Sequence, residues 1–236
     1  MEFFNTSFYD KESGQYSSKR YNKIPTTYTQ FFFQERLRQV LSLVGEFMSN
    51  KNNQVLIEDG CADGVVAFVV GEKHKKTFSH VIGTDISFGM ISEAQRLYPK
   101  IPFYIKNQLP SDMKADLILA VGFVSPGIFD DEFTFIQKHL KKDGKIIVSL
   151  VNNSSIYARL KLRDKEIFQD YWTFDEYEEF LKKEFKIIDS APYGLFVPKL
   201  WVIPTIAIIL QPFFEFIFKP FPSLFHEKLY VLEYKR

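Results

Sequence analysis

Short apolar runs alternate with helix-like segments along most of this chain, and the alternation limits the folds that it can adopt. From residue 54 to residue 151, five such runs each end in a turn or give way to a segment with helical spacing. Strands that alternate with helices in this way form a parallel sheet with helices on both faces. We therefore predict an α/β fold. The predicted strands are residues 54–59, 80–86, 102–106, 115–121, 144–151, 185–190 and 226–234.

Five helices are expected between and before these strands. Apolar residues recur at helical spacing from Leu37 to Phe47, which predicts a helix with one face on the core. Thr173 followed by Glu176 forms a capping box, a typical helix start. Residues 1–30 are polar and rich in tyrosine, and we expect them to form an irregular arm. The predicted helices are residues 34–48, 64–72, 88–98, 130–142 and 173–183.

Composition narrows the function classes. The net charge is +1 and no basic stripe runs along the sequence, so a nucleic-acid partner is not expected. Cys61 is the only cysteine, which rules out an intrachain disulfide and favours a reducing compartment. Residues 1–10 lack a basic segment followed by an apolar run, so we expect no signal peptide and a cytoplasmic location. No His and Cys cluster has metal-ligand spacing, and no metal is expected.

The first strand leads into a turn with two glycines and then a helix. Glu58 and Asp59 end the strand, and Gly60 and Gly64 bracket the turn, within the strand-loop-helix segment of residues 55–67. Gly60 permits a sharp turn, and Gly64 lets the helix begin close to a ligand. The backbone N–H groups of such a turn and of the helix N-terminus form a cradle for a polar ligand.

An acid stands at the end of the second strand, roughly 20 residues after the glycine turn, the spacing found in nucleotide-binding folds. Asp85 at this position can accept hydrogen bonds from both ribose hydroxyls of an adenine-containing ligand. Ser87 is placed to cap the helix that follows. The turn and the acid together indicate a nucleoside site.

The order of these motifs resembles that of class I S-adenosylmethionine-dependent methyltransferases. Gly83-x-Asp85-x-Ser87-x-x-Met90-Ile91-x-x-Ala94 is similar to the family's pattern across the second strand and helix. Further similarities follow in order over about residues 36–190 and in the last strand. They are Leu109-Pro110 after the third strand, 115–118 entering the fourth, 140–147 entering the fifth, and 174–188 across the fourth helix and sixth strand.

The resemblance implies a seven-stranded, mostly parallel sheet whose last strand is antiparallel. It also implies S-adenosyl-L-methionine as cofactor, with Glu58 orienting the methionine amino group and Asp85 holding the ribose. The adenine would lie against Ile86 and near Asn107 or Gln108. The other implied cofactor residues are Gly60, Cys61, Gly64, Val121 and Gly122.

Two positions depart from the family pattern. Ala62 replaces the middle glycine of the loop, and an alanine is strained wherever φ must be positive. Asn107 and Gln108 stand where many members carry an acid after the third strand. Both departures bear on cofactor contacts more than on the fold.

The acceptor side is less defined. Methyl transfer needs a general base only for a poorly acidic acceptor, so no catalytic triad is required, and none is seen. We expect a small-molecule, glycan or lipid-linked acceptor, with O-methylation favoured. The Asn-Pro-Pro-Tyr type motif of base-amino methylases is absent. An inactive member of the fold that only binds or interacts is the alternative. The candidate acceptor residues are Tyr21, Asn152, Tyr157 and His226.

An apolar insertion, residues 194–225, separates the last two strands, which are a tight hairpin in most of the family. Its apolar residues are interrupted by Pro204, Gln211, Pro212 and Glu215, which argues against a membrane span. The two readings left open are a lid of short apolar helices over the acceptor pocket and an interfacial element that contacts a membrane. With a Tyr-rich lid at residues 1–35, the main domain is residues 36–236.

Overall fold

The computed structural model describes residues 6–48, 50–160 and 171–235. Within these ranges, seven strands form one sheet in the order β3-β2-β1-β4-β5-β7-β6. Strands β1 to β5 pair in parallel, and β7 lies antiparallel between β5 and β6. The predicted seven-stranded sheet with an antiparallel last strand is confirmed. The strands are β1 Gln54–Asp59, β2 Phe78–Asp85, β3 Phe103–Ile105, β4 Ala115–Ala120, β5 Leu140–Val151, β6 Phe185–Leu195 and β7 Phe225–Tyr234.

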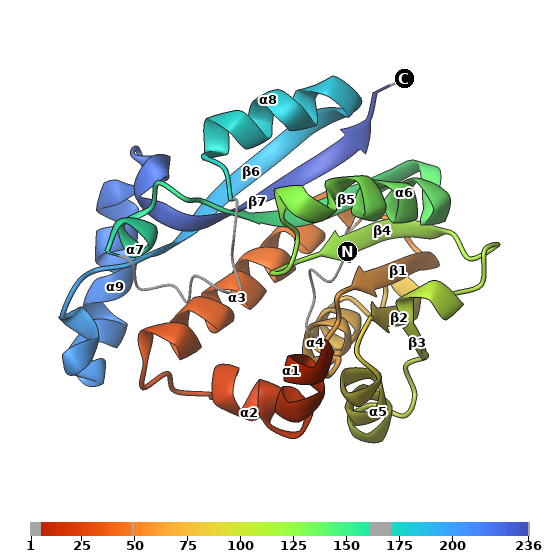
Figure 1. The fold of residues 1–236 in the computed structure, drawn as a ribbon, viewed down its shortest axis with the longest axis horizontal. Coiled ribbons are helices and arrows are strands. Elements are labelled where there is room, and N and C mark those ends of the chain that lie inside the picture. The colour runs from red at the N-terminus through yellow and green to blue at the C-terminus, as the bar shows by residue number, and fades with distance from the viewer. Residues whose placement is uncertain (1–5, 49, 161–170, 236) are drawn as a thin grey trace.

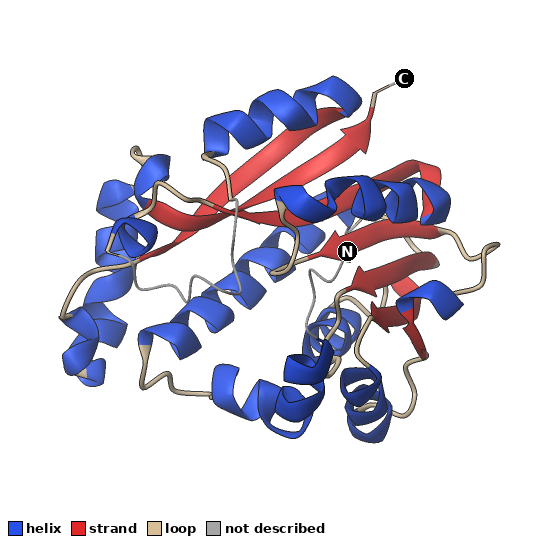
Figure 2. Cartoon of the chain, in the orientation of Figure 1, coloured by secondary structure: helices blue, strands red, loops and turns tan. Residues whose placement is uncertain are grey.

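Helices cover both faces of this sheet (Figures 1 and 2). Helices α3, α4 and α5 pack on one face, and α6 and α8 pack on the other. The helices are α1 Thr6–Glu12, α2 Tyr16–Arg20, α3 Tyr28–Met48, α4 Val65–Lys73, α5 Phe88–Leu97, α6 Phe129–His139, α7 Ile156–Arg159, α8 Phe174–Glu184 and α9 Pro204–Phe218.

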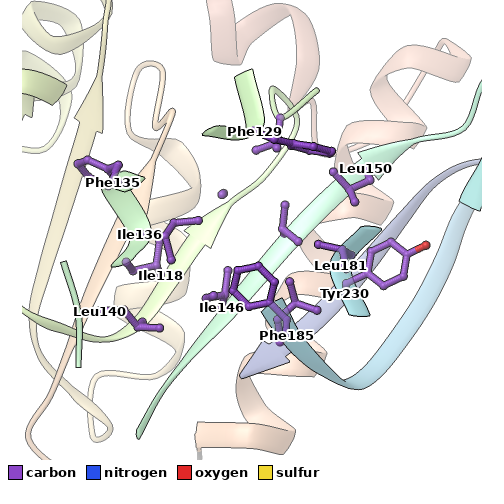
Figure 3. Close-up of a cluster of buried hydrophobic side chains, with 14 of the residues drawn as sticks. Ile118, Phe129, Phe135, Ile136, Leu140, Ile146, Leu150, Leu181, Phe185 and Tyr230 are labelled. Atoms are coloured by element: carbon purple, nitrogen blue, oxygen red, sulfur yellow. The ribbon is translucent and has the colours of Figure 1, made fainter. Parts of the chain in front are cut away.

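The core is split into two layers by the alternation of side chains along each strand. In β4, Leu117 points to the layer beneath α3 and α4, while Ile118 points to the layer beneath α6 and α8. Figure 3 shows the second layer, where Phe129 and Ile136 of α6 lie with Ile118 and Ile146 of the strands. Each fully buried side chain of this size stabilises the fold by roughly 1.5–3 kcal/mol.

The N-terminal segment differs from the expected irregular arm. Helices α1 and α2, joined by a 3-10 turn at Ser13–Gln15, occupy most of it. Helix α3 begins at Tyr28 rather than at residue 34, because Tyr28 and Phe32 continue its buried stripe toward the N-terminus. The polar composition of this segment, which has no apolar stripe, concealed its short helices.

Three other boundaries differ from the predicted ones by at least three residues. Helix α6 ends at His139 and Leu140 already begins β5, so the predicted helix over residues 130–142 is too long and the predicted strand start at residue 144 is too late. Strand β6 runs to Leu195, beyond the predicted end at residue 190, because it pairs with β7 as far as Phe225.

The apolar insertion is helical, as predicted. It contains α9 between 3-10 turns at Leu200–Val202 and Pro222–Leu224, and Pro212 lies inside α9. Among the described residues, no helix combines the length and the hydropathy that a membrane crossing requires.

Candidate functional site

The turn after β1 is built from residues in the left-handed region. Gly60, Ala62 and Gly64 have φ of 68°, 48° and 81°. The Cys61 N–H donates to the Thr84 carbonyl at 2.9 Å, which ties the turn to the end of β2. Gly64 then starts α4 without a side-chain cap. Because the turn leads directly into α4, the N-terminus of this helix lies at the same edge of the sheet as the turn.

Asp85, at the end of β2, is held by the backbone of this turn. Its Oδ2 accepts from the Ala62 N–H and its Oδ1 from the Ser87 N–H, both at 2.9 Å. A carboxylate can accept about four hydrogen bonds, so the two oxygens retain capacity for two ligand hydroxyls. Burial raises the pKa of Asp85, and the backbone hydrogen bonds partly offset that shift.

Glu58, one strand position before Asp59, lies buried on the α3–α4 side of β1. Its Oε2 has no hydrogen-bond partner within the described part of the chain. Burial raises the pKa of Glu58 well above its usual value. A buried carboxyl with one oxygen unpaired favours a neutral form or a cationic partner, and an amino group is such a partner.

Asp59 has the opposite environment. It accepts from Thr84 Oγ1 at 2.8 Å and from Lys106 Nζ at 2.8 Å. Lys106 also contacts Glu132 of α6, whose pKa burial and Asp59 raise to about 8. This cluster ties the ends of β1 and β3 to α6. No pattern in the sequence indicated that Lys106 would turn inward.

Gly122 stands two residues after the end of β4 and has φ of 92°. A side chain there would overlap the guanidinium of Arg36, so the glycine is needed both for its backbone and for this approach. Arg36 donates through Nη2 to Glu227 Oε1 at 2.7 Å and through Nε to the Tyr193 hydroxyl at 3.1 Å. The Glu227 carboxylate keeps the pKa of Arg36 raised.

Helices α1 and α2 lie across the turn after β1 and the start of α5 (Figure 1). Asp10 accepts from Ser87 Oγ at 2.5 Å and from the Gly89 N–H at 3.0 Å, at the start of α5. Ser17 donates through its N–H and Oγ to Asp63 at 2.9 and 2.6 Å. The side of the turn that holds Asp63 and the start of α5 are therefore both covered by this segment.

Three of the four predicted acceptor residues belong to one chain of ring contacts. Tyr21 packs edge-on to Phe33 with centroids 5.6 Å apart, and Phe33 packs edge-on to Phe32 at 5.7 Å. Phe32 contacts His226 at 5.3 Å, and His226 contacts Tyr157 at 4.7 Å. The aromatic chain therefore joins the arm, α3, β7 and α7.

Asn152 lies at the same end of the sheet, but its amide is already occupied. Its Nδ2 donates to the carbonyls of Ser223 and Phe225 at 2.8 and 3.0 Å. Its Oδ1 accepts from Ser154. Asn152 thereby ties the end of β5 to the end of the apolar insertion.

The predicted adenine-side residues lie at the outer edge of the site. Ile86 is 41 % exposed at the end of β2. Asn107 and Gln108 are exposed on the 3-10 turn Lys106–Gln108 that follows β3. Val121, between β4 and Gly122, is partly buried against the α3–α4 layer.

Sequence reasoning missed Arg36, Asp10 and Phe123. A methyl group on Gly60 would overlap the Phe123 ring, so this aromatic residue lies directly on the turn. The only sequence signal for Arg36 was a charge on the apolar stripe of its helix, in register with Phe32 and Val40. No signal identified Asp10, because it belongs to the segment that was expected to be irregular.

The chain is similar in structure to solved methyltransferases. A TehB-like SAM-dependent methyltransferase from Corynebacterium glutamicum ATCC 13032 Kitasato is 13% identical, with a TM-score of 0.57, and the match covers 98% of this chain and 100% of that one. The magnesium protoporphyrin IX methyltransferase ChlM from Synechocystis PCC 6803, with bound SAH, is 13% identical with a TM-score of 0.64 over 100% and 97%. The plantazolicin methyltransferase BpumL in complex with SAH is 17% identical with a TM-score of 0.60 over 99% and 93%.

No family model matches this chain, and no curated protein matches it either. At these identities the structural likeness establishes the fold. The chain has the Rossmann-like fold of class I SAM-dependent methyltransferases.

Proposed function

We propose that this protein is an S-adenosylmethionine-dependent methyltransferase. The observation that carries the proposal is the Asp85 carboxylate, which two backbone N–H groups orient at the end of β2 while capacity for two hydroxyl donors remains. The glycine turn and the N-terminus of α4 lie beside it. Together these features are suited to the ribose and methionine portions of the cofactor.

Glu58 supports the same assignment from the other end of the turn. Its unpaired, buried Oε2 is suited to a cationic amino group. We also assign Gly60, Cys61 and Gly64 of the turn, and Val121 and Gly122 after β4, to the cofactor. Ile86, Asn107 and Gln108 are assigned to the adenine, whose edge would lie at the exposed rim of the site.

When bound, S-adenosylmethionine supplies a methyl group already activated by the sulfonium. The work left to the protein is to hold the acceptor in line and to exclude water. The helices α1 and α2 cover the loops and are suited to the second task, so we assign residues 1–35 as a lid on the main domain. Residues 36–236 then form that domain.

For the acceptor we favour a small molecule, a glycan or a lipid-linked compound, with O-methylation. The aromatic chain from Tyr21 to Tyr157 supports an acceptor with apolar or ring surface. Magnesium protoporphyrin IX and plantazolicin are named with two of the similar proteins. We assign the orientation of an acceptor hydroxyl to Tyr21, Tyr157 and His226, and Asn152 would act by fixing the insertion.

Titration calorimetry with S-adenosylhomocysteine tests the proposal. The wild type should bind, and Asp85→Asn should weaken binding by about 1–3 kcal/mol, the loss expected when hydrogen bonds to a charged buried partner are removed. Asp112→Asn, an exposed carboxylate outside the site, should leave affinity unchanged. A wild type that does not bind at millimolar ligand would exclude the enzyme and leave an interaction protein built on the same fold.

A further inference from the structure

Helix α9 presents its apolar side chains outward. Ile209, Phe213 and Phe216 are 74%, 57% and 78% exposed. Its buried positions are Ala207 and Gln211. This arrangement is the reverse of a normal surface helix, whose apolar stripe faces the core. The exposed apolar residues of the insertion are Val202, Ile203, Ile206, Ile209, Leu210, Phe213, Phe216, Ile217 and Phe221, and we call them the α9 face.

Hydrogen bonds fix this orientation. Gln211, 0% exposed, donates to the Leu195 carbonyl at 2.5 Å and accepts from Trp201 Nε1 at 3.2 Å. Glu215 accepts from the Leu195 N–H at 3.2 Å. Rotating α9 to hide its apolar face would leave these polar groups without partners, so the exposed face is a built feature of the fold.

The α9 face is large for an exposed surface. Since a full aromatic side chain presents about 150–250 Å², Phe213, Phe216 and Phe221 alone expose roughly 300 Å². Contiguous apolar patches above a few hundred Å² mark interaction sites.

Charges at its two ends indicate the kind of partner. Lys199 precedes the insertion's helices and Lys219 follows α9, and both are exposed. Glu215 is the one acid between residues 196 and 225, and its Oε1 is turned inward to Leu195 and Gln211. An apolar strip with a cation at each end and no outward acid complements an anionic lipid surface.

A second copy of the chain fits the α9 face less well. In a two-fold contact with antiparallel α9 helices, Lys199 of one copy would approach Lys219 of the other, and the like charges would repel. The helix has 15 residues, which rise about 22 Å, less than a bilayer core of about 30 Å. A helix of this length and polarity lies along an interface.

We infer that the α9 face docks the protein on an anionic lipid surface, with α9 in the plane of the interface. The insertion also contacts the acceptor-side aromatic chain, because Phe196 packs edge-on to Tyr157 at 5.4 Å and to Tyr28 at 5.0 Å. Docking would therefore bring the acceptor side close to the lipid. The inference does not depend on the proposed methyltransferase activity.

Vesicle flotation tests it, with phosphatidylcholine vesicles that do or do not contain phosphatidylserine. The wild type should float with the phosphatidylserine vesicles, and the double variant Phe213→Ser, Phe216→Ser should remain in the bottom fraction of the gradient. Ile24→Ser removes a residue of similar exposure, 71%, from the arm and should float like the wild type. Lys199→Glu with Lys219→Glu should weaken binding and remove its dependence on salt.

A wild type that stays behind, or a double variant that floats equally well, overturns the inference. A third result also overturns it: a protein that binds no vesicles but forms a concentration-dependent dimer, which the phenylalanine substitutions dissociate. The α9 face would then be a self-association surface. Titration of the same preparations with S-adenosylhomocysteine separates the two proposals. A wild type that floats with the vesicles but does not bind S-adenosylhomocysteine would overturn the methyltransferase proposal and leave the inference on lipid docking intact.

Discussion

The backbone N–H of Ala62 donates to the Asp85 carboxylate at 2.9 Å, and Ala62 makes this bond from the left-handed conformation, with φ of 48°. The residue that departs from the glycine pattern thus orients the acid at the end of the neighbouring strand. An alanine can adopt this conformation at a cost of about 1–2 kcal/mol. The turn keeps its geometry, and the strain at Ala62 lowers the free energy of unfolding.

Replacing Ala62 with glycine should therefore stabilise the protein. Glycine adopts the positive φ freely but loses more entropy on folding, so the net gain should be about 0.5–1 kcal/mol. Urea unfolding measures it. Ala67→Gly, also buried but inside α4, should destabilise by about 1 kcal/mol. Equal losses in both variants would mean that Ala62 is unstrained.

The parallel part of the fold follows from the sequence because its strands and helices have distinct periods. Strand β1 begins and ends at the predicted residues, and Thr173 caps α8 through the expected capping box. The arm could not be predicted, because its helices are held by tertiary contacts such as Asp10 with Ser87. Helices this short depend on packing more than on propensity.

The arrangement of the candidate site was predictable in part for a similar reason. Asp85 and the glycines stand at strand ends, and a parallel sheet gathers such ends at one edge. Arg36 comes from α3, and its partners Tyr193 and Glu227 are more than 150 residues away, at separations of 157 and 191. No local pattern records a contact at that distance along the chain.

The buried pair of Arg36 and Glu227 should show strong coupling. Arg36→Met leaves a buried carboxylate without its cation, and the expected loss in unfolding free energy is about 3–5 kcal/mol. Glu227→Gln should cost less in the Arg36→Met background than in the wild type, with a coupling energy of about 2 kcal/mol or more. A double-mutant cycle by urea unfolding measures this.

The exposed pair of Arg96 and Glu93 is the matched control. Its atoms lie 2.6 Å apart, but Arg96 is largely exposed. Solvent screening should keep its coupling well below that of the buried pair. Additive losses in the Arg36 and Glu227 cycle would show that the two side chains act independently.

Cofactor binding should release a proton from Glu58. Burial raises the pKa of this carboxyl well above its usual value, so in the free protein it keeps its proton to a higher pH than an exposed glutamate does. A bound amino group would favour the carboxylate and lower that pKa. Calorimetry in buffers of different ionisation enthalpy should therefore report net release, which Glu58→Gln abolishes. Glu46→Gln, on the exposed side of α3, should leave the release unchanged, and release that persists in Glu58→Gln would assign the proton elsewhere.

Glu215 should make stability fall as the pH rises. Burial and the nearby Glu35 raise its pKa to about 7, against the opposing effects of Gln211, the Leu195 N–H and Arg38. A carboxyl whose folded pKa lies above its unfolded value binds more protons in the folded state. Its contribution is therefore present at low pH and is lost between the unfolded value of 4.5 and about 7.

Glu215→Gln keeps the shape of the protonated acid and removes the titration. The difference in unfolding free energy between the variant and the wild type should rise by about 2 kcal/mol from pH 5 to pH 8 and then level off. Urea unfolding at a series of pH values measures it. Glu176→Gln is the control, because hydrogen bonds with Thr173 lower the pKa of Glu176 from 4.5. Any stability change from its titration therefore falls below about pH 4.5, and the difference between this variant and the wild type should be flat from pH 5 to pH 8. Parallel curves for Glu215→Gln and the wild type would mean that the Glu215 carboxyl is ionised in the folded protein, and the inward face of α9 would then hold a charge.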